Sequence, residues 1–266
     1  SFTKRKTMIS LKNAWEHSLL RTLLLFGISI VVYDIALQWG WYEVFFGSVV
    51  ANIAWATFMA SIITCFFDKG KYRCYVGYAI LGVHFLLYSF NEIKLWETGS
   101  GRGYFTVPWA TINLIAVAII SSGIQEWIFD RTGKVNEKTG MKRAFMAAFW
   151  FFFIAYLLDF VQWADQQRCT AAFACLILGF SIFFLYLAYA ITIHLKIKLK
   201  ILTLLGKNMF VMFFLAPALG IFLPWLYGDI VFNNRFLALL LVGLLPHLIL
   251  LLTANFLEKK DIIFKI

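Results

Sequence analysis

The chain has 266 residues, of which 62% are hydrophobic and only 14% are charged. Soluble domains carry about 25% charged and 45–50% apolar residues, so this composition excludes an ordinary soluble domain and indicates a polytopic membrane protein. The formal net charge of +10 would suit a nucleic-acid-binding protein, but the positions of the basic residues give the charge a different explanation.

Eight apolar segments are each long enough to cross a bilayer, for which a helix needs about 20 residues. The sequence therefore predicts an all-α, multi-pass integral membrane protein. Residues 1–18 are expected to form a cytoplasmic amphipathic lead-in, residues 19–257 a single helical bundle, and residues 258–266 a cytoplasmic tail. In chain order the predicted spans are Leu19–Gln38, Tyr42–Phe67, Cys74–Phe90, Thr106–Phe129, Ala144–Trp163, Thr170–Leu195, Leu205–Leu226 and Phe236–Leu257.

The basic residues predict the orientation of these spans. Of the 24 Lys and Arg residues, only Lys94, Arg102, Arg168 and Arg235 lie on one side of the eight-span topology. The others lie in the N-terminal segment, in every second loop and in the tail. Because Lys and Arg concentrate in short cytoplasmic loops, both termini are expected in the cytoplasm. The positive charge then needs no nucleic-acid partner, and the expected environment is the lipid bilayer.

The seventh predicted span has an unusual sequence. It begins with Gly206, Lys207 and Asn208, and Pro217 and Pro224 interrupt its second half. Gly and Pro are tolerated in a membrane helix when neighbouring groups or water satisfy the freed backbone. This pattern predicts a helix packed inside the bundle, with one end opening onto a polar cavity.

Polar side chains inside the spans are the candidates for lining that cavity, since ionisable groups in a bilayer usually face a bundle interior or a water-filled space. The alternative interpretation is that the Asp side chains reach the interface and the Asn side chains make hydrogen bonds between helices. The candidates are Asp34, Asn52, His84, Thr111, Asn113, Asp159 and His247.

Among these residues, His84 is the candidate catalytic base, because a neutral imidazole can accept a proton near pH 7. The alternative is a packing histidine that donates one hydrogen bond. Lys207, Asn208 and Glu126 are expected at an inner, cofactor-binding entrance. Lys207 is a candidate phosphate ligand at a helix start, or alternatively one more basic residue of a cytoplasmic loop. The four cysteines show no metal-ligand spacing, so neither a metal site nor a disulfide is expected.

Four stretches match one known family in order, spacing and predicted sidedness: Ser18–Val32 (SLLRTLLLFGISIVV), Thr111–Glu126 (TINLIAVAIISSGIQE), Leu205–Leu215 (LGKNMFVMFFL) and Phe256–Ile266 (FLEKKDIIFKI). Together they resemble the heparan-α-glucosaminide N-acetyltransferase family of membrane-bound acetyltransferases. The resemblance implies that acetyl-CoA enters from the cytoplasm and that the acetyl group reaches a sugar amine or hydroxyl on the far side. It further implies that Asn208 lines the cofactor passage and that Thr111 and Asn113 line the central cavity.

The chain also departs from that family. The family has two further opening helices that carry its catalytic His, and its Gly-Val-Leu-Gln-Arg motif would fall at Gly47–Asn52, which here reads GSVVAN. The sequence is therefore expected to be a fragment or a relative that has lost catalysis. Two functions follow from these expectations: a transmembrane acyltransferase, or a non-catalytic subunit or scaffold of a larger membrane complex. A transporter is a third, weaker interpretation. A Pro- or Gly-interrupted helix in each of two related halves would favour it, but the sequence shows such a helix only in the second half.

Overall fold

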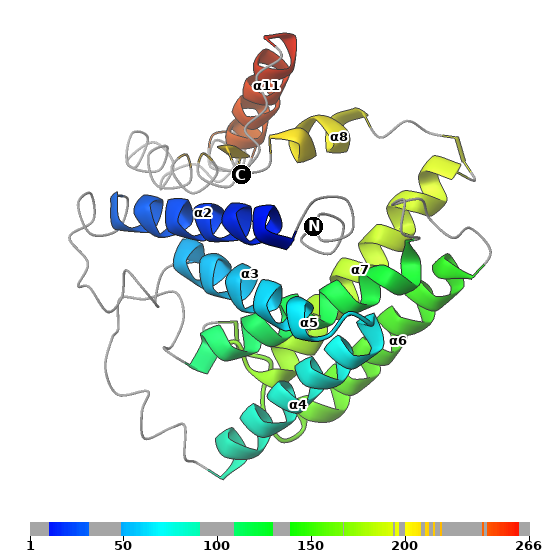
Figure 1. The fold of residues 1–266 in the computed structure, drawn as a ribbon. Coiled ribbons are helices and arrows are strands. Elements are labelled where there is room, and N and C mark those ends of the chain that lie inside the picture. Colours follow the sequence, from blue (N-terminus) through cyan, green and yellow to red (C-terminus); the bar gives the residue numbers. More distant parts are fainter. Residues whose placement is uncertain are drawn as a thin grey trace, which may run out of the picture. The chain divides into compact units, whose positions relative to one another are not determined.

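The computed structural model describes residues 11–31, 49–90, 109–129, 139–166, 168–193, 195–196, 200–208, 211–212, 215, 219, 241 and 244–260. In this part of the chain the regular structure is helical, with no β-strand, which confirms the all-α prediction. The helices are α2 (Leu11–Ser29), α3 (Val49–Phe66), α4 (Gly70–Ser89), α5 (Trp109–Ile128), α6 (Gly140–Asp159), α7 (Ala171–Ile193), α8 (Lys200–Lys207) and α11 (Leu245–Lys259) (Figure 1).

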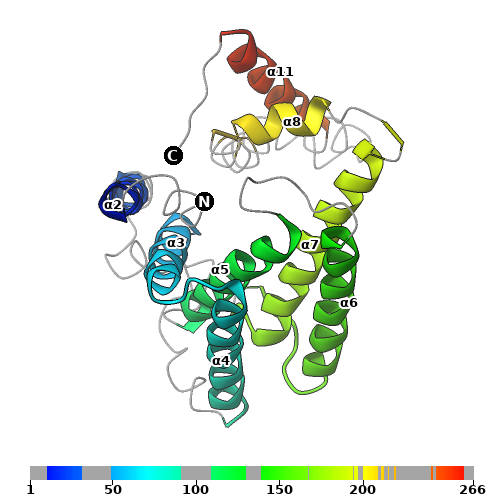
Figure 2. The same cartoon turned by 45° about the vertical axis from the view of Figure 1, so that its right-hand side comes forward.

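The chain divides into two compact units, Ser1–Leu187 and Ala188–Ile266. In the first unit α5 is the central helix, since it packs against α3, α4 and α6, while α2 packs against α3. α6 and α7 lie side by side (Figure 2), with the ring of Phe152 edge-on to that of Phe180 at a centroid distance of 4.9 Å. In the second unit α8 packs against α11.

Small residues allow α4 and α5 to approach closely. A Cβ atom placed on Gly123 would lie 2.5 Å from the carbonyl oxygen of Gly70, and one placed on Gly77 would lie 2.4 Å from a side-chain carbon of Ile120. Helices in a membrane associate largely through such close backbone packing, because lipid supplies no hydrophobic driving force between them. The glycines therefore determine how α4 and α5 pack against each other. This packing in turn positions the polar side chains that the two helices carry.

Three of the described helical stretches are long and apolar enough to cross a membrane: Ala110–Ile128, Gly140–Asp159 and Ala171–Thr192. A shorter apolar helix covers Val50–Phe66. These stretches overlap the predicted second, fourth, fifth and sixth spans, and they indicate a membrane protein. Much of the α6 surface is exposed and apolar, including Phe145, Phe149, Trp150, Phe153 and Tyr156.

Two helix boundaries differ from the sequence-based expectation. α2 starts at Leu11 and runs without a break across the expected boundary between the lead-in and the first span. α8 ends at Lys207, so the lysine expected at the start of a membrane helix is instead the last residue of a short helix. The carbonyl oxygen of Asn208 accepts a hydrogen bond from the N–H of Met212, as at the start of the next helical turn. Lys207 therefore lies beside helix carbonyl groups rather than free N–H groups.

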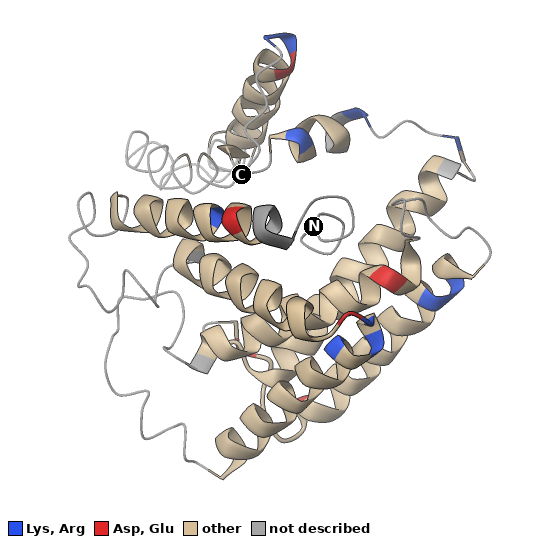
Figure 3. Cartoon of the chain, viewed as in Figure 1, with Lys and Arg blue, Asp and Glu red and all other residues tan. Residues whose placement is uncertain are grey.

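In α4, α5 and α6 the charged residues lie near the helix ends (Figure 3). α7 carries no charged residue, and the only one in α5 is Glu126, in its last turn. The middle of this helical group therefore contains polar side chains that are neutral, and these form the candidate site.

Candidate functional site

His84 on α4 and Asn113 on α5 form a buried polar contact between the two helices. The Asn113 Nδ2 atom lies 2.9 Å from His84 Nδ1 and 2.6 Å from the backbone carbonyl oxygen of Cys169. The three residues are almost completely buried. Two residues that the sequence nominated for a shared cavity thus meet directly, and they hold the segment that connects α6 to α7.

These contacts determine the tautomer of His84. A backbone carbonyl oxygen can only accept a hydrogen bond, so the Asn113 atom that faces Cys169 must be the amide nitrogen. The same nitrogen therefore donates to His84 Nδ1, which must present a lone pair. The proton of the neutral ring then lies on Nε2. In this arrangement His84 offers a hydrogen-bond donor at Nε2, whereas a base would offer an acceptor.

Cys169 has a backbone conformation that suits this contact. Its φ of 43° lies in the left-handed region, which is unfavourable for a residue with a side chain and persists only when the surroundings hold it. The hydrogen bond from Asn113 to its carbonyl oxygen supplies one such restraint. Burial raises the pKa of the Cys169 thiol to about 12, so the thiol stays protonated at neutral pH and is a poor nucleophile.

Gln162 is a buried polar residue in an otherwise exposed segment. Its side chain is 2% exposed, whereas the neighbouring Val161 and Trp163 are 65% and 84% exposed. Its Oε1 atom accepts a hydrogen bond from the N–H of Ala171 at 3.3 Å. Gln162 is therefore directed toward the same connecting segment as Asn113. We call His84, Asn113, Gln162 and Cys169 the His84 cluster.

Three polar atoms of the His84 cluster are buried and have no hydrogen-bond partner among the described residues. They are His84 Nε2, Asn113 Oδ1 and Gln162 Nε2. Most buried polar groups in folded proteins are paired, and an unpaired one costs free energy. Three such atoms in neighbouring side chains make the His84 cluster the candidate site of this helical group.

A second nominated pair lies between α3 and α5, where the Thr111 hydroxyl donates to Asn52 Oδ1. Both residues are buried. The structure thus brings together four nominated residues in two interhelical contacts, Asn52 with Thr111 and His84 with Asn113. Contacts of this kind correspond to the interhelical hydrogen bonds that were the alternative to a lined cavity.

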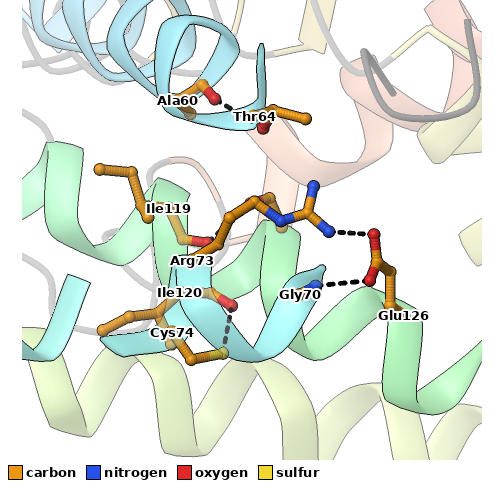
Figure 4. A network of polar contacts seen from close by, with 9 residues as sticks. Ala60, Thr64, Gly70, Arg73, Cys74, Ile119, Ile120 and Glu126 are labelled. Carbon is orange, nitrogen blue, oxygen red and sulfur yellow. Dashed lines mark hydrogen bonds and ion pairs between the residues drawn. The ribbon is translucent and has the colours of Figure 1, made fainter. Parts of the chain in front are cut away.

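The other end of the α4–α5 pair carries charge (Figure 4). Glu126 Oε2 accepts a hydrogen bond from the backbone N–H of Gly70 at 2.6 Å, and its Oε1 forms an ion pair with Arg73. The Arg73 side chain is 0% exposed and that of Glu126 is 35% exposed. We call Gly70, Arg73 and Glu126 the Arg73 cluster. Glu126, nominated for the cofactor entrance, is thus held by α4.

The remaining nominated residues lie elsewhere. Lys207 forms an ion pair of 2.5 Å with Glu258, and both side chains are largely exposed. Asn208 is buried in the second unit, and His247 is exposed on α11. Asp159 accepts a hydrogen bond from the N–H of Ala164 at 2.7 Å and so restrains the turn after α6. Asp34 lies outside the described residues.

Sequence reasoning missed two residues that the structure makes prominent. Gln162 could have been noticed as a polar residue close to the end of the predicted fifth span. Arg73 precedes the predicted third span by one residue and was counted among the basic residues of a cytoplasmic loop. Among the described residues no group of three His, Cys, Asp or Glu side chains is placed to hold a metal ion.

Comparison with known proteins gives no match to a family model, to a curated protein or to a solved structure. The functional interpretation therefore depends on the geometry of the His84 cluster and on the sequence pattern.

Proposed function

We propose that the chain is a membrane acyltransferase that moves an acetyl group from cytoplasmic acetyl-CoA to a sugar acceptor on the outer side. In this proposal it has eight spans with both termini in the cytoplasm, as the distribution of Lys and Arg favours. The His84 cluster then lies in the outer half of the membrane and the Arg73 cluster near the cytoplasmic surface. The observation that carries the proposal is the neutral His84 ring, whose Nε2–H group is buried and without a described partner.

The proposed reaction joins the acceptor to the acetyl carbonyl carbon while the carbon–sulfur bond of the thioester breaks. The proton lost by the acceptor ends on the coenzyme A thiol, so no other reactant is needed. Negative charge develops on the carbonyl oxygen as the acceptor attacks, and a fixed hydrogen-bond donor in a dry site stabilises that charge. We assign this role to His84 Nε2–H, in place of the base expected from the sequence.

Lys207 and Asn208 remain the proposed contacts for the coenzyme, whereas Glu126 is assigned to the scaffold. The exposed Lys207–Glu258 pair belongs to a class worth about 0.2–1 kcal/mol. A phosphate group could therefore replace Glu258 at little cost. Glu126 is bound by a buried arginine, so its displacement would leave an uncompensated charge.

The test uses the complete natural protein, purified and reconstituted into liposomes. Acetyl-CoA labelled in the acetyl group is supplied on the cytoplasmic side, with glucosamine or methyl glucoside on the other, and transferred label is measured. Replacing His84 with Phe should lower the rate about 10²–10³-fold, the usual effect of losing one oxyanion-stabilising donor. His17→Phe on α2 is the matched control and should leave the rate unchanged. If the complete chain gives no transfer above empty liposomes, the proposal fails.

A non-catalytic subunit is the second candidate. It is favoured by the exposed apolar surface of α6 and by the pairing of both charged entrance residues, Glu126 and Lys207. In this case the protein should co-purify with other membrane chains from native membranes in mild detergent. A particle with the size of one chain in its micelle would count against a subunit role.

A further inference from the structure

A patch of apolar side chains projects from the turn that follows α6. Phe160, Val161 and Trp163 are 72%, 65% and 84% exposed, and Trp163 is the most exposed large apolar side chain in the described part of the chain. The ring of Phe160 stands edge-on to that of Tyr156 on α6, at a centroid distance of 5.0 Å. The patch therefore continues the exposed apolar surface of α6. We call Phe160, Val161 and Trp163 the Trp163 patch.

The backbone that carries the Trp163 patch is held by hydrogen bonds. The Thr170 hydroxyl donates to the carbonyl oxygen of Trp163 at 2.9 Å. Within the patch, the side chain of Gln162 is directed inward, where it is buried and accepts a hydrogen bond from the N–H of Ala171. The outward direction of the apolar side chains is thus a property of a structured turn.

The length of α6 places this turn at one boundary of the bilayer. The helix has 20 residues from Gly140 to Asp159, which at 1.5 Å per residue is about 30 Å, the thickness of the hydrocarbon core. Lys142 and Arg143 are exposed near its start, and Asp159 is exposed at its end. Charged side chains are costly in the hydrocarbon core and favour its edges. When α6 crosses the bilayer, the Trp163 patch therefore lies at the boundary opposite the basic pair.

The chemistry of the turn suits lipid headgroups better than a protein partner. Trp combines an apolar ring with a polar N–H group, and it is enriched where hydrocarbon meets water. Asp159 precedes the patch and is exposed, and the Asp165–Arg168 ion pair in the same connection is partly exposed. A protein that covered the turn would have to remove water from these charges, which costs free energy. The headgroup region leaves them hydrated.

We infer that the Trp163 patch binds the lipid surface, with its side chains inserted at the boundary between headgroups and acyl chains. The patch thereby anchors the end of α6 and the start of the α6–α7 connection at a fixed depth. The same connection contains Cys169, whose carbonyl oxygen binds Asn113. This inference goes beyond the proposed function and does not depend on acetyl transfer.

The depth of Trp163 is measured on the complete protein in liposomes that contain brominated lipids. Bromine quenches tryptophan fluorescence at its own depth, and the emission of Trp163 is the difference between wild type and Trp163→Phe. This emission should be quenched more by bromine near the headgroup than by bromine near the chain end, which corresponds to a depth about 15 Å from the membrane centre.

Trp150 is the matched control, because it is also exposed on the surface of α6. It lies halfway along the helix, so it should lie close to the membrane centre. The emission lost in Trp150→Phe should therefore be quenched more by bromine near the chain end. The two tryptophans thus predict opposite depth profiles on one helix.

A second measurement uses the unaltered chain and is independent of whether either variant folds. Lipids that carry a photoreactive group beside the headgroup should attach to residues 160–163, as mapped by mass spectrometry of peptides. Lipids that carry this group at the chain end should instead attach around Trp150. Attachment of both lipids around Trp150 and of neither to residues 160–163 would overturn the inference.

Three fluorescence results would also overturn it. Quenching of Trp163 by aqueous iodide but by neither brominated lipid would place the patch in water. Protection from iodide and from both lipids would show that protein covers the patch, either a second copy of this chain or another membrane subunit. A depth equal to that of Trp150 would place the turn inside the hydrocarbon core.

Discussion

The Arg73 cluster and the His84 cluster both lie between α4 and α5, but the first buries a charged group and the second buries neutral polar groups. In the Arg73 cluster a fully buried guanidinium meets a carboxylate that also accepts the N–H of Gly70. In the His84 cluster the groups are neutral, and three of their atoms have no partner among the described residues. Both arrangements join α4 to α5, the first through a charged pair and the second through neutral side chains.

The physical reason is the difference between burying a charge and burying an amide. An uncompensated buried charge costs several kcal/mol, so Arg73 requires a permanent partner. An unpaired buried amide or imidazole costs about 1–3 kcal/mol, which a closely packed helix pair can tolerate. Charge at one end of α4 and α5 thus requires a permanent partner, whereas the neutral groups at the other end can remain partly unpaired.

The largest expected effect on stability comes from breaking the ion pair of the Arg73 cluster. Glu126→Gln removes the negative charge and leaves Arg73 buried, which should lower the free energy of unfolding by about 3 kcal/mol. Unfolding in mixed detergent micelles, followed by tryptophan fluorescence, measures the change. Glu258→Gln breaks the exposed pair with Lys207 and should cost under about 1 kcal/mol. Equal losses in the two variants would mean that burial of Arg73 is unimportant.

The second-largest expected effect concerns the close approach of α4 to α5, which positions the residues of both clusters. Gly123→Ala places a Cβ atom 2.5 Å from a backbone oxygen of Gly70 and from the sulfur of Cys74, which should cost about 2 kcal/mol through overpacking. The control is Gly82→Ala, where nothing lies within 4 Å of the added atom. Because Ala favours helix over Gly, the control should be neutral or slightly stabilising. A neutral Gly123→Ala would refute the tight packing of α4 on α5.

The smallest expected effect concerns a polar contact that is already paired. Thr111→Val removes the hydroxyl that donates to Asn52, and the loss should be about 0.6–1 kcal/mol in the same unfolding assay. Thr57→Val on α3 is the matched control, because the Thr57 hydroxyl bonds only to carbonyl groups of its own helix in the described contacts. If both variants lose the same stability, the contact between α3 and α5 contributes nothing measurable.

The sequence predicted the helical class and several of the residues that matter. Apolar runs of about 20 residues indicate membrane helices directly, and polar residues within them are few enough to name. His84, Asn113, Asn52 and Thr111 were found in this way. The acetyl-transfer chemistry and the eight-span topology remain predictions, and the liposome assay tests the first of them.

Other features could not be predicted because they depend on packing between distant segments. The position of a polar residue along a helix predicts its depth in the membrane but not its partner. Glu126 was therefore expected to be available to a cofactor, whereas the structure pairs it with Arg73. The tautomer of His84 depends on a carbonyl oxygen of Cys169, far along the chain. Gln162 is recognisable only once its neighbours are known to be exposed and its own side chain buried.

α5 carries residues of both clusters on one uninterrupted helix, from Asn113 near its start to Glu126 near its end. A helix rises 1.5 Å per residue, so about 20 Å separates these two residues along one stiff rod. At Gly123 the backbone of Gly70 lies too close for even a methyl group. The two clusters are therefore held at a fixed separation by one helix, so a substitution that displaces α5 at Gly123 would disturb both of them.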